Sequence, residues 1–177
     1  MRNTFILYKK KKKWMQILTY LTSEGICIGY IDYPYRRLLD ILNNVSSSII
    51  SDTYGDHLRL KDARIDWLGR RETTEITSIS KDDILFIKPI GHSGIPIVPK
   101  RFSKVQLHLP SYTLTGQIHY RHGMNWMNAL DSIYNFFPIT NVEIASQASN
   151  IGHTAPYVAV NKKHISSTEE MEDFKVM

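Results

Sequence analysis

Apolar and polar residues alternate over two neighbouring stretches in the second half of the chain. In KVQLHLPSYTLTGQIHY, residues 104–120, apolar side chains recur at every second position on both sides of Pro110-Ser111. This period indicates strands with one buried face, and Pro110-Ser111 supplies the residues of a turn. We therefore predict a hairpin with one apolar face, which holds Val105, Leu107, Leu109, Leu114, Ile118 and Tyr120.

After each predicted hairpin the apolar spacing becomes helical. The stripes hold Leu38, Leu42 and Val45 in the first half and Trp126, Leu130, Ile133 and Phe137 in the second. Steps of three and four residues place such side chains on one helix face. Further strands are expected over LRLKDARI (58–65), EITSISKDDILFI (75–87), NVEIA (141–145) and YVAVNKKHI (157–165).

Four sequence blocks recur in the same order in the two halves. CIGYIDY (27–33) matches LTGQIHY (114–120), and LLDILNN (38–44) matches ALDSIYN (129–135). LRLKDARI (58–65) matches FPITNVEI (137–144), and ISKDDI (79–84) matches VNKKHI (160–165). Length changes fall only between the blocks, which indicates a tandem repeat.

The blocks RRLLDILNN, LRLKDARI, ISKDDI and VQLHLPSYTLTGQIH resemble a bacterial family of small uncharacterised β-rich domains. That family carries a Leu-x-Gly step in an apolar hairpin, an Arg-Leu-x-Asp-Leu-Leu-Asn block and a Leu-x-Asp-Ala strand. The resemblance spans residues 18 to 165. It implies architecture and no particular activity.

We therefore predict an α+β, mainly β protein with two tandem ββαββ(β) domains, each a small barrel-like unit or a helix-covered sheet. The expected division is a disordered basic leader over 1–13, repeats at 14–88 and 101–165, a Pro/Gly linker at 89–100, and a disordered acidic tail at 166–177.

The first hairpin differs from its counterpart because it is apolar on both faces. We predict that one face holds Leu18, Tyr20, Cys27 and Ile31 and the other holds Ile17, Leu21, Ile26, Ile28 and Tyr30. A sheet with two apolar faces must be covered on both. The cover is either the rest of the chain, including Ile95, Ile97 and Val98 of the linker, or a partner chain such as a second copy.

The net charge of +5 raises the possibility of a nucleic-acid partner. However, residues 1–13 hold six basic groups and no acidic one, so the rest of the chain nets −1. The candidate phosphate contacts lie in the leader and at the second repeat, namely Lys9, Lys10, Lys11, Lys12, Lys13, Lys100, Arg101, Lys104 and Arg121.

The sequence contains no phosphate-loop, dinucleotide-binding, zinc-protease or nucleophile-elbow motif, and a single cysteine, Cys27, forms no internal disulfide. In the predicted register His108 and His119 stand four residues apart along the strands, about 13 Å, which is too far for shared metal ligation. We predict no cofactor and no metal. No apolar run is long enough for a membrane span, and a cytoplasmic location is expected.

These observations lead to a non-catalytic interaction or scaffold protein, which binds a protein partner or itself through Ile17, Leu21, Ile26, Ile28 and Tyr30. Nucleic-acid binding through the leader and the second repeat is the alternative.

Overall fold

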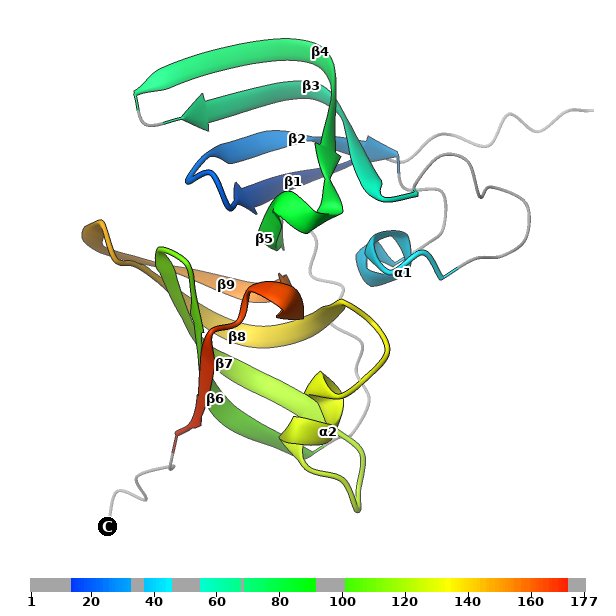
Figure 1. Ribbon diagram of the computed structural model, residues 1–177, viewed down its shortest axis with the longest axis vertical. Coiled ribbons are helices and arrows are strands. Elements are labelled where there is room, and N and C mark those ends of the chain that lie inside the picture. The colour runs from blue at the N-terminus through cyan, green and yellow to red at the C-terminus, as the bar shows by residue number, and fades with distance from the viewer. Residues whose placement is uncertain (1–13, 33–36, 46–54, 68, 92–100, 172–177) are drawn as a thin grey trace, which may run out of the picture.

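The first half of the chain folds mainly into strands in this computed structural model, which describes residues 14–32, 37–45, 55–67, 69–91 and 101–171 (Figure 1). The predicted leader, most of the predicted linker and residues 172–177 of the predicted tail lie outside the described residues. The elements are β1 (Trp14–Leu21), β2 (Ile26–Asp32), α1 (Leu38–Leu42), β3 (His57–Trp67), β4 (Arg70–Ser80), a 3-10 turn (Lys81–Asp83) and β5 (Ile84–Pro89).

The second half has elements of the same kinds in the same order. They are β6 (Arg101–Leu109), β7 (Tyr112–Tyr120), α2 (Trp126–Leu130), β8 (Phe136–Ser146), β9 (Ser149–Asn161), a 3-10 turn (Lys162–His164) and β10 (Ser167–Glu170). The predicted hairpin around Pro110-Ser111 is confirmed, since Leu109 pairs with Tyr112. Residues 167–170, which we assigned to the tail, pair with β6 instead.

The ten strands among the described residues all belong to one antiparallel sheet, in the order β10-β6-β7-β8-β9-β5-β1-β2-β3-β4. The halves meet where Phe86 and Ile87 of β5 pair with Val160 and Ala159 of β9. The first half lies above and the second below in Figure 1, with β5 and β9 between them.

The predicted fold class is therefore wrong. The protein is nearly all β, and its strands form one open sheet rather than two α+β domains. The helical stripes misled us because α1 and α2 have only five residues each, too few to cover a sheet. Ile133, which we assigned to the second stripe, lies beyond α2 and is 89% exposed.

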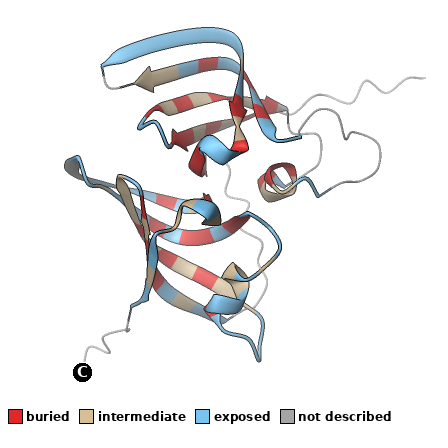
Figure 2. Ribbon diagram, in the orientation of Figure 1, coloured by how far each residue is buried: buried red, intermediate tan, exposed pale blue. Residues whose placement is uncertain are grey.

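Two hydrophobic cores lie on opposite faces of this sheet. Along β5, Ile84 and Ile87 join the first core, whereas Leu85 and Phe86 join the second. In β9, Ala159 belongs to the first core and its neighbours Val158 and Val160 belong to the second. Successive strand residues point to opposite faces, except at Leu85, where the pairing of β5 with β1 shifts register, so these central strands are apolar on both faces. Buried residues accordingly concentrate around them in Figure 2.

The recurring glycine has the same role in both halves. Each glycine lies where the pairing between the second and third strands changes register, at Gly29 and at Gly116. A Cβ at Gly29 would approach Leu60 Cβ to 3.0 Å, and one at Gly116 would approach Thr140 O to 2.9 Å. The close approach of the neighbouring strand is therefore what requires a glycine at both positions.

Candidate functional site

The first hairpin does not present the two faces that we predicted. Leu18 pairs with Ile28 and Gln16 pairs with Tyr30, whereas Ile17 pairs with Gly29. Directly paired residues share a face, so Ile17 lies opposite to Ile28 and Tyr30. The turn causes this difference, because Leu21 N donates to Gly25 O and Glu24 adopts a φ of 63°. This turn shifts the pairing of β1 with β2 by an odd number of residues from the predicted pairing, which exchanges the faces.

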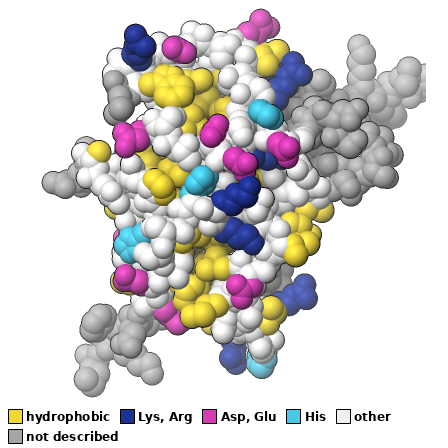
Figure 3. Space-filling view, viewed as in Figure 1, with side chains coloured by type: hydrophobic (Ala, Val, Ile, Leu, Met, Phe, Trp, Pro, Cys, Tyr) yellow, Lys and Arg dark blue, Asp and Glu magenta, His cyan; other side chains and the backbone are white. Residues whose placement is uncertain are grey.

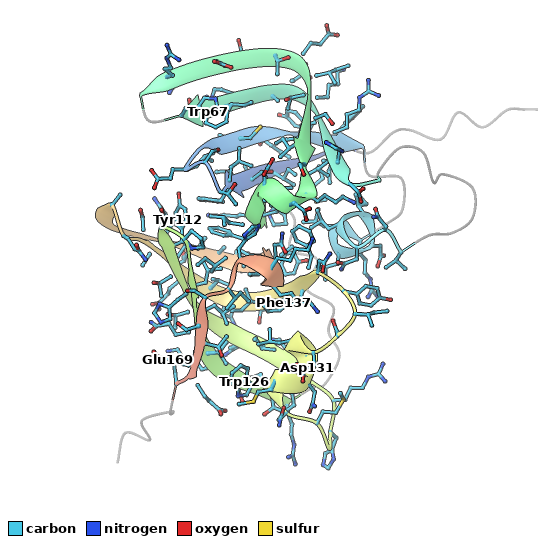
Figure 4. The ribbon with its side chains drawn as sticks, viewed as in Figure 1. Trp67, Tyr112, Trp126, Asp131, Phe137 and Glu169 are labelled. Carbon is cyan, nitrogen blue, oxygen red and sulfur yellow. The ribbon has the colours of Figure 1, made fainter. Side chains whose placement is uncertain are left out.

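Three of the five predicted interface residues are covered by the protein itself. Ile17 and Leu21 are buried in the first core, and Ile26 packs against the second. The second half covers this end of the hairpin, where Tyr20 meets Tyr112 edge to face with ring centres 5.3 Å apart. Tyr112 is labelled in Figure 4, at the upper end of the second half. Ile28 and Tyr30 are half-buried on the outer face of the first half.

Two apolar residues outside our prediction share that outer face with Ile28 and Tyr30. Trp14 is 41% exposed and Ile76 is 48% exposed. Tyr30 pairs with Lys61 and Lys61 pairs with Ile76, so one cross-strand row reaches β4. The Lys61 ammonium lies 5.4 Å from the centre of the Trp14 ring. We call Trp14, Ile28, Tyr30 and Ile76 the outer patch.

The outer patch ends at a strand with no neighbour on one side. β4 is the last strand of the described sheet, and residues 70–76 along it are exposed. Lys81 N donates to Asp56 O across the β3–β4 ladder at 2.8 Å. Main-chain groups alternate in direction along such a ladder. Those of Thr77 and Ile79 therefore point toward β3, and those of Ile76 and Ser78 point to the open side.

A cleft lies between α1 and the segment that precedes β8. It comprises a polar cavity of about 260 Å³ and an adjoining one of about 270 Å³, and Asn43 contributes to both. The Asn43 side chain donates to Phe136 O and accepts from Phe136 N, each at 2.8 Å. The buried Asn161 side chain donates to Lys81 O and Ile84 O at 3.2 and 3.0 Å. These two asparagines thus join main chain across the two halves.

Lys81 is the buried cation of this cleft. Its Nζ donates to Ile41 O at 2.9 Å and to Asn44 Oδ1 at 2.7 Å, at the end of α1. Lys162 is the matching residue of the second half, and its Nζ donates to Leu130 O at the end of α2 and to Ser132 O just after it. Each lysine therefore satisfies carbonyls that a short helix leaves without partners.

Burial lowers the pKa of Lys81 from 10.5 to about 8, although the nearby Asp56 carboxylate opposes this shift. The unfolded chain then binds the proton more tightly, so we expect the stability to rise with pH between about 8 and 10.5. Burial also raises the pKa of Cys27 from 9.0 to about 11, which lowers the stability above pH 9. The Lys81 effect is thus clearest from pH 8 to 9.

The substitution Lys81→Met tests this pH dependence. In urea unfolding, the wild-type protein should gain about 1 kcal/mol from pH 8 to 9, and Lys81→Met should lose that gain. Lys163→Met, at an exposed lysine that binds Asp82, is the matched control and should keep it. An equal gain in Lys81→Met would show that another group is responsible.

The histidines on β6, on β7 and just after β7 have separate neighbours. His108 pairs with Thr113 and His119 with Phe102, because the two-residue turn sets a register different from the one we used. The His119 ring lies 2.6 Å from Thr140 Oγ1, and the His122 ring lies 3.3 Å from Arg101. Within the described ranges, no three His, Cys, Asp or Glu side chains come close enough together to hold a metal ion.

Three of the predicted nucleic-acid contacts lie at the hairpin β6–β7, where Arg101, Lys104 and Arg121 are exposed. Arg101 and Lys104 point to opposite faces of β6, since they are three residues apart. On the face drawn in Figure 3, acidic and basic side chains are interspersed. Lys9 to Lys13 and Lys100 lie outside the described residues, so the nucleic-acid alternative stays a prediction.

In the part of the chain that the structure describes, no helix has the length and apolar character that a membrane crossing requires. Comparison with protein-family models, with curated proteins and with solved structures gives no match.

Proposed function

We propose that this protein is a non-catalytic interaction protein that receives a strand of a protein partner at the open edge of β4. The observation that carries the proposal is the outward direction of the main-chain groups of Ile76 and Ser78. They lie beside an outer patch whose Trp14 and Ile76 are about half exposed. This version keeps Ile28 and Tyr30 from the sequence prediction, and it omits Ile17, Leu21 and Ile26, which pack inside the molecule.

The chemistry of β4 favours strand addition. An added strand gains main-chain hydrogen bonds from the edge and specificity from nearby side-chain contacts. Soluble proteins commonly protect such edges with charged residues, prolines or bulges. The segment from Ile76 to Ser80 has none of these, and its pairing with β3 is regular from residue 76 to residue 80.

The polar groups of the cleft support a structural role for that region. Asn43, Lys81 and Asn161 each bind main-chain atoms of neighbouring elements. Such bonds satisfy buried carbonyls and amides and hold the halves together. In this proposal the cleft therefore holds the two halves of the protein together, and β4 is the surface that binds the partner.

The test compares Ser78→Pro with Ser78→Ala. Proline removes the outward amide of an edge strand, where it is tolerated, and alanine keeps that amide. Tagged protein is recovered from cells that also express an untagged copy with the same residue at position 78, so that every β4 edge in the cell is of one kind. Wild type and Ser78→Ala should retain the same partner, and Ser78→Pro should lose it while keeping its thermal unfolding midpoint. A partner that Ser78→Pro retains equally would overturn the proposal.

A further inference from the structure

The joint between the halves shows which strand edges of this protein fit each other. Within the first half the strand order is β5-β1-β2-β3-β4, and within the second it is β10-β6-β7-β8-β9. By position, β9 corresponds to β4 and β5 corresponds to β10. At the β5–β9 joint, an end strand of one half therefore pairs with the opposite end strand of the other half. The counterpart of β9 is β4 and the counterpart of β5 is β10, and these two strands form the open ends of the described sheet.

Local geometry supports this correspondence residue by residue. Asp62 and Asn141 both take a left-handed conformation, with φ of 48° and 50°. In both 3-10 turns the preceding side chain accepts from a main-chain amide two residues on, Ser80 from Asp82 and Asn161 from Lys163. The second turn begins at Lys162, 81 residues after the first turn begins at Lys81, so residues around the two turns correspond at a spacing of 81.

The hydrogen-bond directions of the open edges also match those of the joint. Lys162 N donates to Asn135 O, so alternation directs the main chain of Ala159 toward β5, where it pairs with Ile87. The counterpart of Ala159 is Ser78, whose main chain points to the open side of β4. At the other end Met171 N donates to Lys104 O, which directs the main chain of Thr168, the counterpart of Ile87, to the open side of β10.

We infer that β4 of one copy of this protein pairs antiparallel with β10 of a second copy, with Ser78 opposite Thr168. This inference rests on the proposed function, because it identifies the partner strand at β4 as β10 of another copy. The contact joins two different surfaces, so each added copy leaves the same two edges open. Assembly therefore proceeds head to tail, into a ring if the rotation closes and into a filament if it does not.

The contact between copies should be weaker than the joint within one chain. Phe86, Ile87, Ala159 and Val160 at the joint are all fully buried. Their counterparts at the open edges are Ser167, Thr168, Ser78 and Ile79, of which only Ile79 is apolar. Little apolar surface is then removed from water at the new contact. We therefore expect assembly to depend on protein concentration.

Disulfide capture tests the register directly. Directly opposed residues in an antiparallel pair have Cα atoms about 5.5 Å apart, within the range that a disulfide spans. Ser78→Cys and Thr168→Cys are made separately in the full-length protein, mixed and oxidised with oxidised glutathione. The mixture should form a linked dimer, and the double variant Ser78→Cys/Thr168→Cys should form a ladder of linked oligomers.

The matched control replaces Thr168→Cys by Glu169→Cys, which points to the other face of β10. We expect about ten-fold less linked dimer in that mixture, since its thiols cannot meet in register. The native Cys27 does not interfere, because it is fully buried and its thiol has a raised pKa.

Two results separate this inference from the proposed function. Suppose that the matched mixture gives no more linked dimer than the control, but that Ser78→Pro loses a bound partner other than a second copy. The β4–β10 contact is then wrong, and the proposed function of the β4 edge stands. If the matched mixture gives no excess and Ser78→Pro releases nothing, both are wrong.

Discussion

Replacing Phe86 by alanine should destabilise the protein by about 3–5 kcal/mol, as expected for a large aromatic residue lost from a core. Phe86 is fully buried, stacks on Tyr20 with ring centres 4.2 Å apart, and meets Tyr112 edge to face at 5.4 Å. It comes from β5 of the first half, yet it packs in the second core. The loss should therefore weaken both halves, as measured by urea unfolding and by amide hydrogen exchange in β3 and β8.

Leu58→Ala is the control for this prediction. Leu58 is also fully buried, but it lies in β3 and belongs to the first core. Under conditions that permit partial opening, we expect Leu58→Ala to accelerate exchange mainly in the first half. If Phe86→Ala accelerates exchange in β8 alone, the two cores do not depend on each other through β5.

The succession of elements could be read from the sequence to a large extent, whereas the arrangement of the sheet could not. Alternation locates strands such as β6 and β7, but it carries no information about which distant strands pair. The decisive pair, Phe86 with Val160, is 74 residues apart in the chain. The signal for it was the apolar run ILFI at residues 84–87, which is buried toward both faces.

The assignment of apolar residues to the two faces of the first hairpin was wrong, and the error has a local cause. The sequence marked the first hairpin as apolar on both faces, and the structure indeed buries Ile17 on one and Tyr20 on the other. Which residues share a face depends on how the turn between the two strands sets their pairing. That pairing follows from the left-handed conformation of Glu24, and glutamate rarely adopts this conformation, so the sequence did not indicate it.

Several shared residues have the structural roles that their types suggest. Asp40 accepts from Arg37 N at 3.2 Å, and Asn44 takes a left-handed conformation after α1. Asn43 differs, because it binds the main chain of Phe136 in the other half. The matching position in the second block is Tyr134. This difference between the blocks indicated that Asn43 does not serve the local helix end that both halves share.

Gly116→Ala should lower the free energy of unfolding by about 1–3 kcal/mol, the usual cost of forcing extra atoms into a filled space. The added Cβ would lie 2.9 Å from the main-chain oxygen of Thr140 and 3.0 Å from Ile139 Cγ1. Gly29→Ala should cost less, because its Cβ would meet side-chain atoms of Leu60 and Ala63 at 3.0 Å or more. A Cβ at Gly116 meets three atoms at 2.9–3.1 Å, whereas one at Gly29 meets one atom at 3.0 Å and two at 3.4 Å, so the surroundings of Gly29 must shift less.

The matched control is Gly55→Ala, since nothing lies within 4 Å of a Cβ at that position. It should change the stability by less than about 0.5 kcal/mol, as surface substitutions do. Urea unfolding of the three variants gives the order directly. The expected order, Gly116 above Gly29 above Gly55, follows from how closely β3 and β8 approach the preceding strands at their bulges. Equal costs at Gly116 and Gly55 would mean that this close approach does not explain why the glycine recurs in both halves.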